Sequence, residues 1–153
     1  MKQLPFLIAV LIAALALSAC ASTAKPAASD ACTEAVLTVS GGEISKAYTR
    51  ADLEALTATE ATFKDVTYKG VLISTLLKDA GFDPSTIKAV KGVASDGYAV
   101  NYDTNQVLVD NVIVAYATAG GELTAEDGSF RMVLPDAEGK LNMRMLVELQ
   151  VMK

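Results

Sequence analysis

The N-terminal segment decides how much of this 153-residue chain can fold into a domain. Lys2 is followed by an uninterrupted apolar run, residues 6–17, and then by the small residues Ser18 and Ala19. A charged start, an apolar centre and a small-residue end are the three parts of a secretory signal peptide, and this run is too short to span a bilayer comfortably. We therefore predict that residues 1–19 are a signal peptide and add nothing to the core.

Cys20 directly follows this segment. The four residues Leu17-Ser18-Ala19-Cys20 resemble the lipobox of bacterial lipoproteins, in which the cysteine is acylated and starts the mature chain. The resemblance implies lipidation at Cys20, attachment to a bacterial membrane and an extracytoplasmic location, because several acyl chains anchor a protein where one binds only marginally. An ordinary cleaved signal peptide with an incidental cysteine is the alternative.

Residues 20–33 are predicted to be a flexible tether. Residues 21–32 are small and polar, with one proline and no large apolar side chain, so they cannot bury a core. With Cys20 lipidated, Cys32 has no partner for an intramolecular disulfide. We favour an inert cysteine there over an intermolecular disulfide or a reactive free thiol. Residues 34–153 then form the folded domain.

Charge and histidine content exclude several classes of function. The chain carries 13 basic and 18 acidic residues, a net charge of −5, and removing the signal peptide takes away Lys2 and no acid, which leaves −6. Nucleic-acid binding needs clustered Lys and Arg, so DNA and RNA are not expected partners. The chain has no histidine, which excludes Ser-His-Asp and Cys-His catalysis and the imidazole ligand of most zinc and haem sites.

Capping residues predict three helices. Thr49 has the character of an N-cap, with Asp52 three residues later, and opens a short helix. Apolar residues over 73–80 follow the i, i+3, i+4, i+7 rule and end at Gly81, a typical C-cap residue. A capping box formed by Asp103 and Gln106 predicts a third helix, through Val109.

Runs of β-branched and aromatic residues predict the strands. The predicted strands are residues 36–39, 60–68, 87–94, 98–102, 112–117, 130–134 and 144–152. Residues 112–117 are apolar on both faces, which is typical of a covered central strand. In the last strand, Met145, Val147, Leu149 and Val151 are predicted to share one face. Strands mixed with short helices favour an α+β domain with a mixed sheet.

Five segments, taken together and in order, carry a family resemblance. The segments are Tyr68-Lys69-Gly70-Val71 with the following Leu76-Leu77 and Ala80-Gly81, Ser95-Asp96-Gly97-Tyr98, Asp110 to Tyr116, Gly120-Gly121-Glu122-Leu123 and Phe130 to Pro135. They resemble the molybdopterin-binding domain of sulfite oxidase and its bacterial relatives. The resemblance implies the sulfite-oxidase-type fold, a mixed α+β domain that holds a molybdenum pterin in the enzymes. It makes molybdopterin a candidate cofactor, while the sequence leaves the cofactor itself unassigned.

One departure from the family concerns the metal. The enzymes place a molybdenum-ligating cysteine before the aromatic-x-Gly-Val segment, because a soft thiolate tunes the metal. Residues 57–67 of this chain contain no cysteine, and Cys32 lies on the tether. We therefore predict no metal ligand in the domain, and the resemblance implies that the fold is kept while the catalysis is lost.

Three residues are the candidates for cofactor binding. The segment 139–145 resembles the family's phosphate-contacting stretch: Arg144 matches a basic position, while Asn142 stands where a small hydroxyl residue is common and Met145 where a tryptophan is usual. Arg131 is predicted to point away from its apolar neighbours in its strand, toward a ligand phosphate or, as the favoured alternative, an acidic side chain. Arg144 could instead start an edge strand in solvent.

Other side chains have two interpretations. Four tyrosines could line an aromatic pocket for a flat ring or could pack in the sheets: Tyr68, Tyr98, Tyr102 and Tyr116. Met143 and Met145 could offer thioethers to a soft metal such as Cu(I), but core packing is the favoured interpretation. Lys140 is expected in a solvated turn.

Three functional hypotheses remain. The first, which we favour, is a lipoprotein that binds a pterin, another flat cofactor or a small ligand without catalysis. The second is a molybdopterin-dependent oxidoreductase with an atypical metal site. The third is an interaction module that lost the cleft and docks to a partner. A cleft lined by both Arg131 and Arg144 would favour the first hypothesis over the third, whereas scattered arginines would favour docking.

Overall fold

Strands dominate the described part of the chain, residues 34–153 of the computed structural model, because short β-prone runs alternate there with turn residues. The signal peptide over 1–19, the tether over 20–33, lipidation of Cys20 and the state of Cys32 concern residues outside this range and stay predictions. Within residues 34–153, no helix has both the length and the hydropathy needed to cross a membrane.

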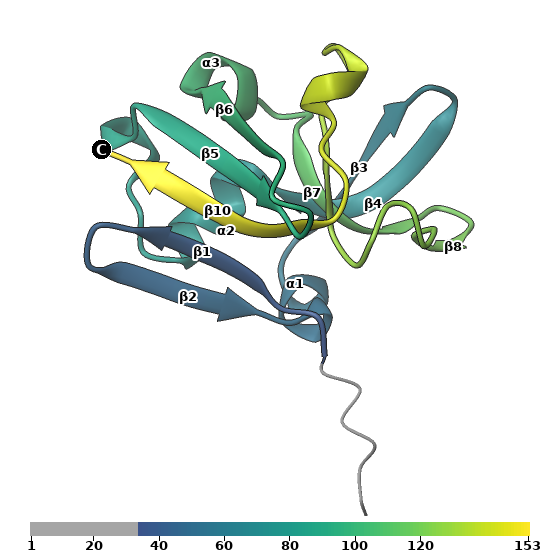
Figure 1. Ribbon diagram of the computed structural model, residues 1–153, viewed down its shortest axis with the longest axis horizontal. Coiled ribbons are helices and arrows are strands. Elements are labelled where there is room, and N and C mark those ends of the chain that lie inside the picture. The colour runs from purple at the N-terminus through teal and green to yellow at the C-terminus, as the bar shows by residue number, and fades with distance from the viewer. Residues whose placement is uncertain (1–33) are drawn as a thin grey trace, which may run out of the picture. The chain divides into compact units, whose positions relative to one another are not determined.

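The first sheet has five strands in the order β2-β1-β10-β5-β6. They are β1 (Leu37–Gly41), β2 (Ile44–Tyr48), β5 (Ala89–Ala94), β6 (Ala99–Asp103) and β10 (Leu146–Met152). Strand β1 runs parallel to β10, and the other neighbours are antiparallel, so the sheet is mixed. Figure 1 shows the C-terminal strand β10 in the middle of this sheet, where it joins the N-terminal hairpin to β5.

The second sheet is antiparallel and runs β3-β4-β7-β8, with β9 also paired to β7. Its strands are β3 (Ala58–Phe63), β4 (Val66–Leu72), β7 (Ile113–Thr118), β8 (Gly121–Glu122) and β9 (Arg131–Val133). Five of the six residues of β7 are buried, which confirms the predicted central strand. At Gly70 a Cβ atom would lie 2.1 Å from the carbonyl oxygen of Val114, so only glycine allows β4 and β7 to approach this closely.

Three short α-helices connect the strands: α1 (Arg50–Ala55), α2 (Ile73–Asp79) and α3 (Thr104–Val107). The predicted caps are confirmed: Thr49 and Asp52 form a capping box, and so do Asp103 and Gln106. Two 3₁₀ turns, η1 (Pro84–Thr86) and η2 (Gly139–Leu141), complete the elements of residues 34–153.

One hydrophobic core joins both sheets to the helices. It includes Val39 and Leu149 from the first sheet, Val71 and Val114 from the second and Leu76 from α2, all with no exposed surface. Each such side chain contributes about 1.5–3 kcal/mol through its burial. A smaller cluster that includes Tyr68 lies apart from this core and packs beside the site described below.

The prediction of one strand over residues 60–68 is wrong. The chain forms two strands there, β3 and β4, joined at Lys64 and Asp65, whose φ angles are 49° and 65°. Two consecutive left-handed residues make a tight hairpin turn that usually carries Asn-Gly or Asp-Gly. The Lys-Asp pair lacks that signature, so the local sequence concealed the turn.

The prediction for the last strand is also partly wrong. Strand β10 begins two residues later than expected, at Leu146, and its pairing with β5 contains a register irregularity. Met145, just before it, has a φ of 52°. An extra residue in a strand reverses the alternation of side chains, so Val147 is 37% exposed and does not share the buried face of Leu149 and Val151.

Candidate functional site

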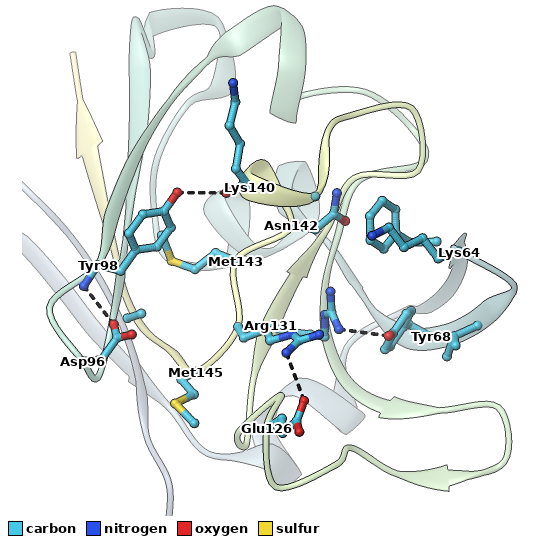
Figure 2. Close-up of a pocket in the computed structure, with 15 residues that line it drawn as sticks. Lys64, Tyr68, Asp96, Tyr98, Glu126, Arg131, Lys140, Asn142, Met143 and Met145 are labelled. Atoms are coloured by element: carbon cyan, nitrogen blue, oxygen red, sulfur yellow. Dashed lines mark hydrogen bonds and ion pairs between the residues drawn. The ribbon is translucent and has the colours of Figure 1, made fainter.

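An open pocket of about 730 Å³ lies where β4, the turn after β5, the segment before β9 and the turn before β10 meet. This volume falls within the usual range for small-molecule sites. We call it the Arg131 pocket; its lining includes Lys64, Tyr68, Tyr98, Arg131, Asn142 and Arg144. Figure 2 shows Tyr68 and Tyr98 on opposite sides, with Arg131 between them.

Arg131 is buried at the base of this pocket, with a side chain only 4% exposed. Its Nη1 donates to the Tyr68 hydroxyl at 2.9 Å and forms an ion pair with Asp127 at 2.5 Å, and its guanidinium lies 4.5 Å from the centre of the Tyr68 ring. Strand alternation turns Arg131 away from Phe130 and Met132, which pack in the main core, as predicted. The predicted salt bridge with an acid is therefore confirmed.

Asp127 links the two candidate arginines. Its Oδ1 accepts the bond from Arg131 and lies 3.5 Å from Nε of Arg144, while Thr124 donates to its Oδ2 at 2.9 Å. Arg144 is 56% exposed and also pairs with Glu126, at 3.1 Å. The structure thus brings Arg131 and Arg144 to one pocket, which is the arrangement expected of a ligand site rather than of scattered surface charges.

Asn142 shapes the pocket through the backbone. Its Oδ1 accepts from the Leu134 amide at 2.7 Å, and its Nδ2 donates to the carbonyls of Leu134 at 3.0 Å and Glu138 at 3.3 Å. These bonds hold the turn between β9 and η2 and occupy the side-chain amide. A contact between Asn142 and a cofactor stays a prediction, as do those of the two arginines.

Basic residues outnumber acidic ones in the pocket lining, although the chain is acidic. The lining contains the basic residues Lys64, Arg131, Lys140 and Arg144 and the acidic residues Asp96 and Glu126. Lys64 takes part in none of the salt bridges formed within residues 34–153. Lys140 pairs with Glu138 at 2.7 Å in solvent, and this ion pair raises the pKa of Lys140 and lowers that of Glu138. An anionic group would find two to three donors on different walls.

Arg131 also keeps an unsatisfied donor. Its Nε is buried and has no hydrogen-bond partner within the described chain. An unpaired buried donor costs roughly 1–3 kcal/mol, so a bound acceptor would recover part of that free energy. This orphaned N–H is the feature of the pocket that fits an anionic ligand best.

The remaining candidates divide between pocket and core. Tyr68 and Tyr98 line the pocket, whereas Tyr102 and Tyr116 are buried in the main core. Met143 is buried in the core, as favoured, and its side chain also reaches the pocket wall. Tyr98, which is 47% exposed, donates to the Lys140 carbonyl at 3.2 Å and ties the two walls together.

The donor set of the pocket suits the organic part of a molybdopterin better than its metal. The basic side chains match a phosphate, and two tyrosine rings flank the space for a flat ring system. Within residues 34–153, no group of three or more His, Cys, Asp or Glu side chains could hold a metal ion. Both cysteines of the chain, Cys20 and Cys32, lie before this range. The described pocket therefore offers molybdenum no thiolate.

Two functional residues escaped the sequence analysis. Asp127 was not singled out, and its spacing of four residues from Arg131 gave no signal of a pair, because that spacing brings side chains together on a helix and neither residue lies on one. Lys64 was hidden in the strand predicted over 60–68. Only a prediction of the hairpin turn between β3 and β4 would have placed Lys64 on the pocket wall.

Two sheets around one core, with a basic pocket at the strand ends, define an α+β ligand- or cofactor-binding domain. The family model of the oxidoreductase molybdopterin binding domain matches residues 30–153, and the chain belongs to that family. Its fold is the sulfite-oxidase-type molybdopterin-binding fold, as the sequence resemblance implied.

A solved structure with the same fold is that of the sulfane dehydrogenase SoxCD from Paracoccus pantotrophus. The two chains superpose with a TM-score of 0.64 at 21% sequence identity. The match covers 76% of this chain and only 38% of the SoxCD chain, so this protein spans less than half of that relative. No curated protein matches the chain.

Proposed function

We propose that this protein is a membrane-anchored extracytoplasmic lipoprotein whose domain binds a molybdopterin or a similar flat anionic ligand without catalysing a reaction. The observation that supports this most directly is the convergence of Arg131 and Arg144 on one pocket, through their shared partner Asp127. An interaction module that had lost the cleft would have no reason to keep a buried arginine with an open N–H edge beside a cavity.

The pocket residues would divide the work of binding. Arg131 and Arg144, with Lys64 from the β3–β4 turn, would neutralise a phosphate, and the rings of Tyr68 and Tyr98 would flank the heterocycle. Asn142 would act by holding the turn before β10. In the enzymes of the family the bound molybdenum pterin supplies redox chemistry, with the metal tuned by a protein thiolate. The absence of a cysteine from residues 57–67 argues against that chemistry here.

The decisive test is to purify the full chain from a host that makes molybdenum cofactor and to measure its molybdenum and pterin content. Elemental analysis gives the metal, and fluorescence after denaturation gives the pterin. Pterin at near-stoichiometric amounts without metal is the expected result. Both together at that level would overturn the non-catalytic assignment in favour of an oxidoreductase with an atypical metal site. If neither pterin nor molybdenum is found, pterin is ruled out as the ligand.

The proposed anchor needs its own test. Replacing Cys20 with serine removes the thiol that the lipobox-like sequence would acylate, so Cys20→Ser protein is expected in the soluble fraction while the unaltered chain stays with membranes. Cys32→Ser is the matched control and should leave the distribution unchanged. Equal membrane attachment of both variants would contradict the lipoprotein assignment.

A further inference from the structure

A second cavity, of about 530 Å³, shares the loop that follows β8 with the Arg131 pocket but is lined by different side chains. We call it the Tyr116 pocket. Its lining includes Glu34, Arg50, Tyr116 and Glu122. Nothing in the proposed function uses these residues.

Within residues 34–153, the Tyr116 hydroxyl has no hydrogen-bond partner. Tyr116 is only 2% exposed, and its hydroxyl oxygen is buried without a hydrogen bond in the described chain. Tyr102 provides the contrast, because it is also buried yet donates to the Leu141 carbonyl at 2.8 Å. Leaving a buried hydroxyl unpaired costs stability. The packing of the protein therefore does not explain why such a hydroxyl is kept beside a cavity.

Arg50 supplies a charge on the wall of the same cavity. It begins α1, pairs with Glu54 at 2.9 Å through Nε and reaches Glu122 at 3.3 Å through Nη1. Glu122 is 83% exposed on the short edge strand β8, so its hold on Arg50 is weak and exchangeable. Burial and the nearby Glu54 carboxylate raise the pKa of Tyr116, whose hydroxyl therefore stays protonated as a donor at neutral pH.

The charges around the cavity are mixed. One cation, Arg50, faces two carboxylates, Glu34 and Glu122. A ligand with only negative charge would be repelled by the two carboxylates, and one with only positive charge would leave Arg50 and the hydroxyl donor unused. A ligand whose carboxylate binds Arg50 and Tyr116, and whose ammonium group binds Glu122 and Glu34, satisfies all four side chains.

We infer that the Tyr116 pocket binds a small zwitterion that carries both a carboxylate and an ammonium group, of the size of an amino acid or dipeptide. The carboxylate displaces Glu122 from Arg50 and accepts the Tyr116 hydroxyl proton in a hydrogen bond. The cavity volume is ample for such a molecule and falls in the range of small-molecule sites.

The stability of two Tyr→Phe variants tests whether the hydroxyl is unsatisfied. Tyr116→Phe in the full chain is expected to match or exceed the unaltered protein in its urea midpoint, because it removes an unpaired buried group. Tyr102→Phe is the matched control and is expected to lower the midpoint, because it leaves the Leu141 carbonyl without its donor. A Tyr116→Phe loss as large as that of Tyr102→Phe would show that a buried water already satisfies the hydroxyl, and would overturn the inference.

Binding is tested with L-alanyl-L-alanine as the probe, by calorimetry and by chemical-shift changes in the full chain. The unmodified dipeptide is expected to bind at least tenfold more tightly than its N-acetyl form, which lacks the ammonium group, and than its C-terminal amide, which lacks the carboxylate. Arg50→Gln and Tyr116→Phe are each expected to weaken binding about tenfold or more. Lys88→Gln, a change on the exposed surface outside the cavity, is the control.

Two results would overturn the inference. The first is equal binding of all three peptide forms, or binding that both cavity variants leave unchanged. The second is no binding at millimolar dipeptide. Because the pterin content of the same samples is measured separately, failure here leaves the proposal for the Arg131 pocket standing, and the reverse also holds.

Discussion

The Arg131 pocket and the Tyr116 pocket share one loop but differ in whether their buried polar groups have bonding partners. In the first, the buried cation has an acidic partner, Asp127, and its buried Nε has no hydrogen-bond partner in the described chain. In the second, the buried hydroxyl of Tyr116 has no partner among the described residues, and the charged residues lie at the exposed rim. The buried ion pair of the first pocket therefore contributes to the stability of the fold. In the second pocket, the unpaired hydroxyl lowers stability unless a ligand or a water molecule bonds to it.

The largest effect is expected from breaking the buried ion pair. Asp127→Ala leaves the Arg131 charge buried without its partner and should cost about 3–5 kcal/mol of unfolding free energy, measured by urea denaturation. Glu126→Ala is the matched control: its carboxylate, 80% exposed, meets Arg144 in solvent and should contribute no more than about 1 kcal/mol. Equal losses in the two variants would contradict the contrast between buried and exposed pairs.

A smaller effect is expected at Gly128, a glycine in the wall of the Tyr116 pocket. Gly128 has a φ of 76°, and a Cβ there would lie 2.9 Å from Cα of Met145, so Gly128→Ala should cost about 1–3 kcal/mol. Gly120→Ala meets only the Thr118 hydroxyl, at 3.9 Å, and should change stability by less than about 0.5 kcal/mol. Thermal unfolding followed by circular dichroism compares the two, and a harmless Gly128→Ala would show that the loop tolerates rearrangement.

The burial of the Tyr116 hydroxyl should also affect how the stability of the protein changes at alkaline pH. The folded state raises the pKa of Tyr116 above its ordinary value of 10.0. The unfolded state then ionises before the folded state does, so the folded state loses stability relative to it as pH rises from the unfolded pKa through the folded one. Tyr116→Phe should therefore lose stability less steeply above about pH 10 than the unaltered chain. Denaturation at several alkaline pH values, with tyrosinate absorbance, measures this; identical slopes would contradict the assigned burial.

The smallest effect on stability is expected at Arg144. Arg144→Ala removes exposed contacts and should change the unfolding free energy by less than about 0.5 kcal/mol. Because Arg144 also lines the Arg131 pocket, the same variant should carry less pterin after purification from a cofactor-producing host. Full pterin occupancy in Arg144→Ala would remove this residue from the proposed binding set.

The sequence analysis anticipated those parts of the fold that depend on neighbouring residues. The N-cap at Thr49 and the capping box at Asp103 were confirmed, and so was Gly81 after α2, whose φ is 94°. These features depend on bonds between residues two to four positions apart, which the order of residues already specifies. The central position of β7 followed equally directly, because apolar residues on both faces require cover on both sides.

The site was anticipated only in part. Arg131 and Arg144, two of the candidates for cofactor binding, do line one pocket, and their contact with a cofactor stays a prediction. The turn at Lys64 was missed because its residues lack the usual turn signature. The exposure of Val147 was missed because the alternation of apolar and polar residues does not predict a bulge.

By itself, the sequence determined the fold class, the helix caps, the central strand and the absence of a cysteine from the segment where the family's enzymes carry their metal ligand. Only the tertiary structure decided that Asp127 joins Arg131 to Arg144, that Tyr68 lies beneath the guanidinium and that Tyr116 is left without a partner. The physical reason is distance along the chain. Local bonds are specified by spacing, whereas a pocket forms from segments that meet only after the sheets have paired and the core has closed.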